Sequence, residues 1–133
     1  YYFCGEGGKD KSVWDKAPYP VTDATPVFRN IHFNGITVRD AHAAAGFIYG
    51  LAEMPVDNVT FENISVEMAD NARPGVPAMM SGLKPMRKRG FICCNARNIS
   101  FNRVTVTGNE GPAFHMERVK DVFVDGTDYS ALP

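Results

Sequence analysis

The sequence predicts an all-β protein in which short strands wind into a parallel β-helix. Three observations support this prediction: a short motif recurs along the chain, apolar and polar residues alternate within each copy, and a further apolar run follows three of the copies. Repeats of this length are typical of solenoids, because each repeat is one unit that packs against the next. We expect about four to five coils, stacked ~4.8 Å apart.

The recurring motif is Asn or Asp, then Ile or Val, and later Phe, with a second Ile or Val near its end. Its copies are Arg29–Val38, Asn58–Val66, Arg97–Val106 and the weaker Lys120–Gly126. The leading Asn or Asp stands at residues 30, 58, 98 and 121, at intervals of 28, 40 and 23 residues. Each interval therefore predicts one coil, with the extra length in loops.

Alternation within the second copy predicts two short strands that meet at a corner. Val59 and Phe61 point to one side, and Thr60 and Glu62 to the other, as in a half-buried strand. The alternation breaks at Glu62–Asn63 and then resumes. Asn and Gly occur at the equivalent places (Asn34–Gly35, Asn63 and Asp125–Gly126), and both tolerate the left-handed backbone of a sharp bend.

A third strand follows the motif, at Gly46–Leu51, Gly90–Cys94 and Gly111–Met116. One repeat is then strand, corner, strand, loop, strand, with no amphipathic helix between strands. A β-sandwich also has many short strands and is the alternative. Its strands do not repeat in sequence, however, so the repeat favours the β-helix.

The remaining segments predict one partial domain over residues 1–133. Tyr1–Phe3 resembles a strand, so we expect the chain to begin inside a coil. Residues 11–26 form a polar excursion that Trp14 and Tyr19 hold down, and residues 68–89 form a long inserted loop. Loops this long are often functional. We expect another segment to cover the C-terminal sheet edge, which shows no helical cap.

Composition excludes several classes of protein. The 133 residues carry a net charge of −1, which gives no basic field for nucleic acid. No apolar run reaches the ~20 residues of a membrane helix. The three cysteines Cys4, Cys93 and Cys94 fit no zinc spacing, and we interpret them as buried thiols. We predict no cofactor and no metal site.

Three segments carry a resemblance to a known family: Thr25–Phe33 (TPVFRNIHF), Gly46–Pro55 (GFIYGLAEMP) and Asn58–Ile64 (NVTFENI). They resemble the C-terminal coils of glycoside hydrolase family 28, the polygalacturonases and related pectin-degrading enzymes. The resemblance implies a right-handed parallel β-helix and hydrolysis of galacturonosyl bonds with inversion, which needs an acid and a base carboxyl ~6.5–9.5 Å apart. It also implies an extracellular or periplasmic protein whose partners are acidic plant polysaccharide and the upstream coils of the same enzyme.

The family's catalytic signatures are absent from this chain. Asn-Thr-Asp, Asp-Asp, Gly-His-Gly and Arg-Ile-Lys do not occur, and in the family they lie upstream of the region that this chain resembles. We therefore expect a C-terminal fragment that has no catalytic residues of its own. Two alternatives stay open: a self-standing, non-catalytic β-helix module that binds acidic polysaccharide or mediates assembly, and a calcium-dependent lyase, for which no acidic cluster is seen.

Candidate substrate contacts are basic, aromatic or close to glycine-rich turns. They are Glu6, Lys9, Tyr49, Lys84, Arg87, Arg89 and His115. Lys84, Arg87 and Arg89 belong to a basic cluster on the longest loop, and an arginine fork matches a carboxylate. Tyr49 and His115 fall on corresponding strands of different coils. The alternative interpretation is a solvated loop for the basic residues and a structural role for the histidine.

Overall fold

The computed structural model describes residues 15–78, 80 and 82–130, and within them the protein is all-β, without a helix. The six strands are β1 (Arg29–Ala41), β2 (Ala44–Tyr49), β3 (Val56–Met68), β4 (Arg89–Thr107), β5 (Phe114–Val124) and β6 (Thr127–Asp128). The predictions for Tyr1–Phe3, Cys4 and Trp14 lie outside these residues. No helix in the described part of the chain is long and apolar enough to cross a membrane.

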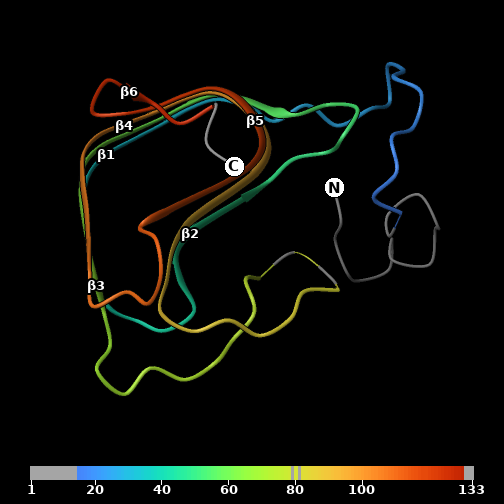
Figure 1. The fold of residues 1–133 in the computed structure, drawn as a ribbon. Coiled ribbons are helices and arrows are strands. Elements are labelled where there is room, and N and C mark those ends of the chain that lie inside the picture. Colours follow the sequence, from blue (N-terminus) through green and yellow to red (C-terminus); the bar gives the residue numbers. More distant parts are fainter. Residues whose placement is uncertain (1–14, 79, 81, 131–133) are drawn as a thin grey trace.

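Successive copies of the motif pair in parallel. Arg29 of β1 is opposite Asp57 of β3, Asp57 is opposite Arg97 of β4, and Arg97 is opposite Lys120 of β5. These offsets equal the intervals between the motif copies in the sequence. Each copy therefore stacks directly on the previous one, and in Figure 1 the passes of the chain overlie one another around a common outline.

A second set of parallel pairs forms from the strands that follow the motif. Ala44 of β2 is opposite Arg89 of β4, and Phe91 of β4 is opposite Phe114 of β5. Strand β4 thus serves two layers, because its first residues pair with β2 and its later residues pair with β3. This parallel-rich arrangement is compatible with the predicted β-helix.

Left-handed residues bend the strands at the predicted corners and at further places along the chain. Gly35 (φ 71°) and Asn63 (φ 53°) confirm the corner inside the motif. The leading residues of all four copies are also left-handed: Asn30, Asn58, Asn98 and Asp121 have φ between 53° and 60°. A third bend lies at Asn95 (φ 51°), inside β4. Asn and Asp adopt this conformation at lower cost than other non-glycine residues, which explains their repetition.

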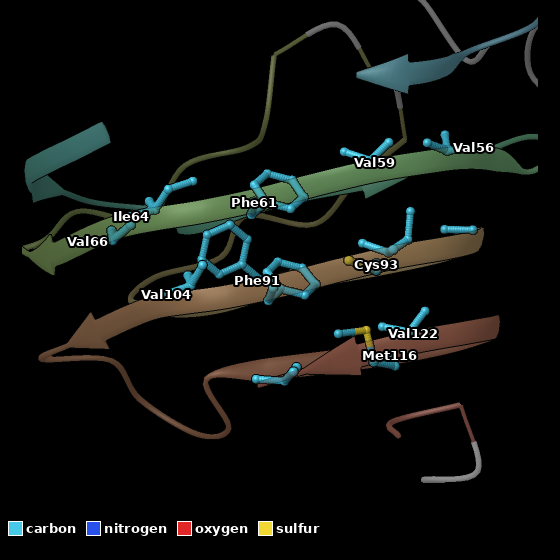
Figure 2. Close-up of a cluster of buried hydrophobic side chains, with 14 of the residues drawn as sticks. Val56, Val59, Phe61, Ile64, Val66, Phe91, Cys93, Val104, Met116 and Val122 are labelled. Carbon is cyan, nitrogen blue, oxygen red and sulfur yellow. The ribbon is translucent and has the colours of Figure 1, made fainter. Parts of the chain in front are cut away.

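The inward side chains form one apolar core between β3, β4 and β5, and Figure 2 shows Phe61 and Phe91 facing each other within it. Val59 and Phe61 are buried, as the alternation predicts. The motif phenylalanines stack: the rings of Phe33 and Phe61 lie 5.1 Å apart, and those of Phe61 and Phe101 lie 4.8 Å apart. Identical positions on adjacent coils therefore pack on one another.

The long loop, residues 69–88, packs against the body, in keeping with its predicted inserted position. Ala69 and Ala72 are buried, and the amide of Arg73 donates to Nδ1 of His42. Gly75 and Met86 form a β-bridge that closes the loop on itself. The excursion over residues 15–28 contains no strand.

Two details of the strand predictions are wrong. The third strand of the last repeat begins at Phe114 and not at Gly111, because Gly111 is left-handed (φ 78°) and Pro112 follows it outside any strand. The sequence analysis also missed β6, which pairs with β5 in antiparallel orientation. This short strand, with Tyr129 and Ser130, pairs with the last three residues of β5, Val122–Val124.

Candidate functional site

Tyr49 and His115 lie on the same face of the sheet formed by β2, β4 and β5. His115 is opposite Ile92, and Ile92 is opposite Phe47. Tyr49 is two residues beyond Phe47, so the two candidates point to the same side of the sheet, two positions apart along the strands. The inward side of the same sheet holds Phe91, Cys93 and Met116. The structure therefore places Tyr49 and His115 on the outer side, both partly buried.

The basic candidates lie beyond the other end of these strands. Arg89 opens β4 opposite Ala44, five residues before the position of Tyr49. That spacing corresponds to about 17 Å along an extended strand. Lys84 and Arg87 are exposed on the long loop, and Arg87 Nη2 lies 2.7 Å from Glu110 Oε1. The structure therefore does not bring the basic loop together with Tyr49, and Glu6 and Lys9 lie outside the described residues.

Tyr49 instead meets Arg118, which the sequence analysis did not select. The Arg118 Nη2 atom lies 3.5 Å from the Tyr49 hydroxyl, and Arg118 also forms an ion pair with Glu117. Its Nε donates to Oδ1 of the buried Asn95 at 2.8 Å, and Asn95 Nδ2 donates to the Gly50 carbonyl at 3.0 Å. These contacts hold the guanidinium in one orientation at the third bend.

The close approach of two coils at this bend explains why residue 50 is a glycine. A Cβ atom at Gly50 would lie 2.1 Å from the Asn95 carbonyl oxygen. Asn95 (φ 51°) and Arg118 (φ 52°) occupy the equivalent positions on the next two coils and are left-handed. An arginine in this conformation is uncommon, and its contacts with Asn95 and Glu117 offset the strain.

The pKa shifts around Tyr49 keep Arg118 charged and keep the Tyr49 hydroxyl and the Cys94 thiol neutral. Burial raises the pKa of Tyr49, and the neighbouring Cys94 adds to the effect. Burial and the Glu117 carboxylate raise the pKa of the Cys94 thiol to about 11. Partial burial opposes the charge on Arg118, but Glu117 outweighs it and the pKa of Arg118 is raised. At neutral pH the thiol is protonated, so Cys94 is not an activated nucleophile.

Four charged residues form a row along the stack, and together with Arg118, which lies two residues before Lys120 on β5, we call them the corner strip: Arg29, Asp57, Arg97, Lys120 and Arg118. The first four occupy the motif position just before the leading Asn or Asp, so parallel stacking brings them into one column. Arg97 Nε lies 3.0 Å from Asp57 Oδ2, and the Asp57 carboxylate also accepts a hydrogen bond from Asn98 at 2.7 Å. Arg29 and Lys120 are exposed, and no ion pair is recorded for either among the described residues.

The sequence carried a signal for the corner strip. A charged residue precedes the leading Asn or Asp in every copy, and three of these four residues are cationic. Comparing equivalent positions between copies would have found the column, whereas searching for local clusters selected the loop residues.

An apolar hollow adjoins Tyr49. It has a volume of about 350 Å³, and its aromatic lining residues are Phe28, Phe47 and Tyr49. Met54 and Met80 also line it. A surface that combines aromatic rings with oriented guanidinium groups can bind a ligand that has both an apolar face and carboxylates. Within the described residues, no three or more His, Cys, Asp or Glu side chains are grouped to hold a metal ion.

Comparison with known proteins gives no further guide: no family model, curated protein or solved structure matches this chain.

Proposed function

We propose that this chain is the C-terminal part of a pectin-degrading glycoside hydrolase, folded as a right-handed parallel β-helix. In this proposal the chain contacts acidic polysaccharide, and upstream coils supply the catalytic carboxylates. The substrate class is a galacturonate polymer, and its location outside the cell or in the periplasm follows from that substrate.

The observation that carries the proposal is the corner strip. Parallel coils repeat ~4.8 Å apart, so the strip places the cations Arg29, Arg97 and Lys120 in one column along the stack, with Asp57 between Arg29 and Arg97. An acidic polymer carries its charges at regular intervals. Arg97 and Arg118 are held in place by Asp57 and Glu117, which lowers the cost of ordering them around a carboxylate. The aromatic hollow beside Tyr49 adds an apolar contact surface.

The segments that resemble the family support the same proposal. Thr25–Phe33 leads into β1, Gly46–Pro55 covers most of β2 and the third bend, and Asn58–Ile64 lies in β3. The resemblance therefore falls on the elements that form the stack and flank the corner strip.

Binding of oligogalacturonate to the chain tests the proposal. We expect saturable binding, followed by isothermal titration calorimetry, that weakens as salt is added, whereas a neutral oligosaccharide of the same length does not bind. The double variant Arg97→Gln with Lys120→Gln should bind about 10-fold more weakly, because two charge-assisted contacts are lost. Arg39→Gln with Arg73→Gln removes the same charge away from the strip and is the matched control.

Two results would contradict the proposal. Equal losses in the strip variant and the control would mean that binding depends on overall charge. Binding of the neutral oligosaccharide with the same affinity would exclude recognition of carboxylates.

The alternative is a non-catalytic β-helix module that binds acidic polysaccharide or mediates assembly, and the exposed strip is equally compatible with it. The denatured mass of the protein made by its source organism separates the two. A mass several times 14.6 kDa favours the hydrolase, and a mass near 14.6 kDa favours the module.

A further inference from the structure

The apolar interior is open at β1. Phe33 and Ile36 are each 38% exposed, whereas Phe61 and Ile64, which stand opposite them on β3, are 8% and 5% exposed. A hollow of about 360 Å³ at this end is lined by inward side chains of β1, β2 and β3. Residues that the motif assigns to the core are therefore partly uncovered on the first strand.

The backbone of this end is also available for pairing. Strand β1 pairs with β3 along one edge, and the described residues place no strand against its other edge. Strand β2 similarly pairs with β4 alone among the named strands. Unpaired strand edges present rows of N–H and C=O groups that can pair with a further strand.

The side-chain ladders have a direction, and they point toward an additional strand. Asn58 Nδ2 donates to Asn30 Oδ1 at 2.8 Å, and Asn63 Nδ2 donates to Asn34 Oδ1 at 3.0 Å. Each amide donates to the coil before it, so the exposed Nδ2 groups of Asn30 and Asn34 are placed to donate to acceptor oxygens on a coil before β1. One face of the Phe33 ring stacks on Phe61, and the ring is exposed toward the open end.

We propose that the β1 end binds a parallel β-coil of the same repeat, with Asn or Asp opposite Asn30 and a large apolar residue opposite Phe33. Such a coil would supply acceptor oxygens for these amide groups, cover Phe33 and Ile36, and pair with the β1 edge in one step. The inference rests on the β-helix part of the proposed function and is independent of its sugar chemistry.

A second copy of the chain fits this end less well. Two β1 edges related by a two-fold axis would pair in antiparallel orientation. The left-handed bends at Asn30 and Gly35 would then fall out of register with their partners. In such a dimer, the asparagine amide donors at the β1 edge of one copy would also face the same amide donors of the other copy.

A peptide with the sequence of residues 57–68 (DNVTFENISVEM) provides the probe, because it carries the repeat with its asparagines and phenylalanine. We expect the peptide to bind the full chain saturably and to slow amide hydrogen exchange in β1 and not in β6, as measured by NMR. A peptide with both asparagines replaced by leucine should bind at least about 10-fold more weakly, because it lacks the acceptor oxygens.

Variants of the chain test the docking surface itself. Phe33→Ser should reduce peptide binding about 10-fold, in proportion to the apolar area lost. Phe123→Ser is the matched control, because Phe123 is 39% exposed but lies on β5 at the opposite end, and it should leave peptide binding unchanged.

Three outcomes would overturn the inference. No binding, or equal binding of the leucine peptide, would remove the ladder argument. Slow exchange of β1 amides without peptide in a monomer would mean that the chain covers its own edge. The same protection accompanied by a concentration-dependent dimer would make a second copy the occupant. Peptide binding without oligogalacturonate binding would leave this inference standing and contradict only the proposed sugar function.

Discussion

The two ends of the strand stack carry copies of the same motif, but their inward residues are covered to different extents. At the β5 end, β6 pairs with β5, the Tyr129 ring packs edge-on against Phe114 at 6.0 Å, and the Val122 amide donates to Ser130 Oγ. Val124, the last inward residue of that copy, is 9% exposed. At the β1 end, Phe33 in the equivalent position is 38% exposed. The motif therefore determines which residues point inward, and the neighbouring segment determines whether they are buried.

The largest expected effect compares one ring in the middle of the stack with one at its open end. Phe101 is fully buried and contacts Phe61, Phe91 and Phe114. Phe101→Ala should lower the free energy of unfolding by about 4 kcal/mol. Phe33→Ala should lower it by about 1 kcal/mol, because the ring is partly exposed and leaves no closed cavity. Urea unfolding of both variants measures the difference, and equal losses would mean that the β1 end is covered in solution.

Removing the Tyr129 ring should make amide exchange at the β5 end resemble that at the β1 end. Tyr129→Ala deletes the ring over Phe114 and should cost about 2 kcal/mol. Hydrogen exchange of the β5 amides should then rise toward that of β1. Exchange in β5 that does not change would show that backbone pairing with β6, and not the ring, protects this end.

Acid should weaken contacts near both ends. A hydrogen bond from Asn98, supported by Arg97, lowers the pKa of Asp57, and bonds from the Ser130 backbone and hydroxyl lower the pKa of Asp128. Because both pKa values are depressed in the folded state, the associated stability is present above the unfolded value of 3.8 and is lost as the pH falls through the folded values. Urea unfolding between pH 6 and pH 2 should show a smaller loss for Asp57→Asn than for the unaltered chain. An identical pH profile would contradict a role for this carboxylate.

The smallest expected effect is the absence of thiol reactivity in the middle of the stack. Burial raises the pKa of Cys93 to about 12, with a further contribution from Cys94, whose own pKa is about 11. At pH 8 neither thiol should react with a disulfide reagent in the folded protein, and both should react in urea. Reaction of Cys93 at the rate of β1 amide exchange would mean that opening of the β1 end reaches the centre of the stack.

Much of the fold could be predicted from the sequence because the repeat acts locally. The motif intervals give the strand register, since Asn30, Asn58 and Asn98 must each bend the chain and can stack only on one another. Alternation gives the buried positions, as at Val59 and Phe61. The bend at Asn95 was missed, because its partners Gly50 and Arg118 share no residue type that would reveal a column.

The candidate site was predicted only in part, because it combines residues that are distant in the sequence. The sequence identified Tyr49 and His115 but offered no reason to join Tyr49 to Arg118, which is 69 residues further along the chain. It selected Arg87 for its basic neighbours, yet Arg87 pairs with Glu110 on another loop.

The sequence by itself determined the strands, their corners and their parallel register, since these depend on alternation and on residues that tolerate left-handed backbone. The tertiary structure alone decided that Arg118 meets Tyr49, how Asn95 orients Arg118, and that β6 pairs with the last residues of β5. Those features depend on contacts between coils, whose partners are set by the number of residues in each loop and not by the local residue pattern.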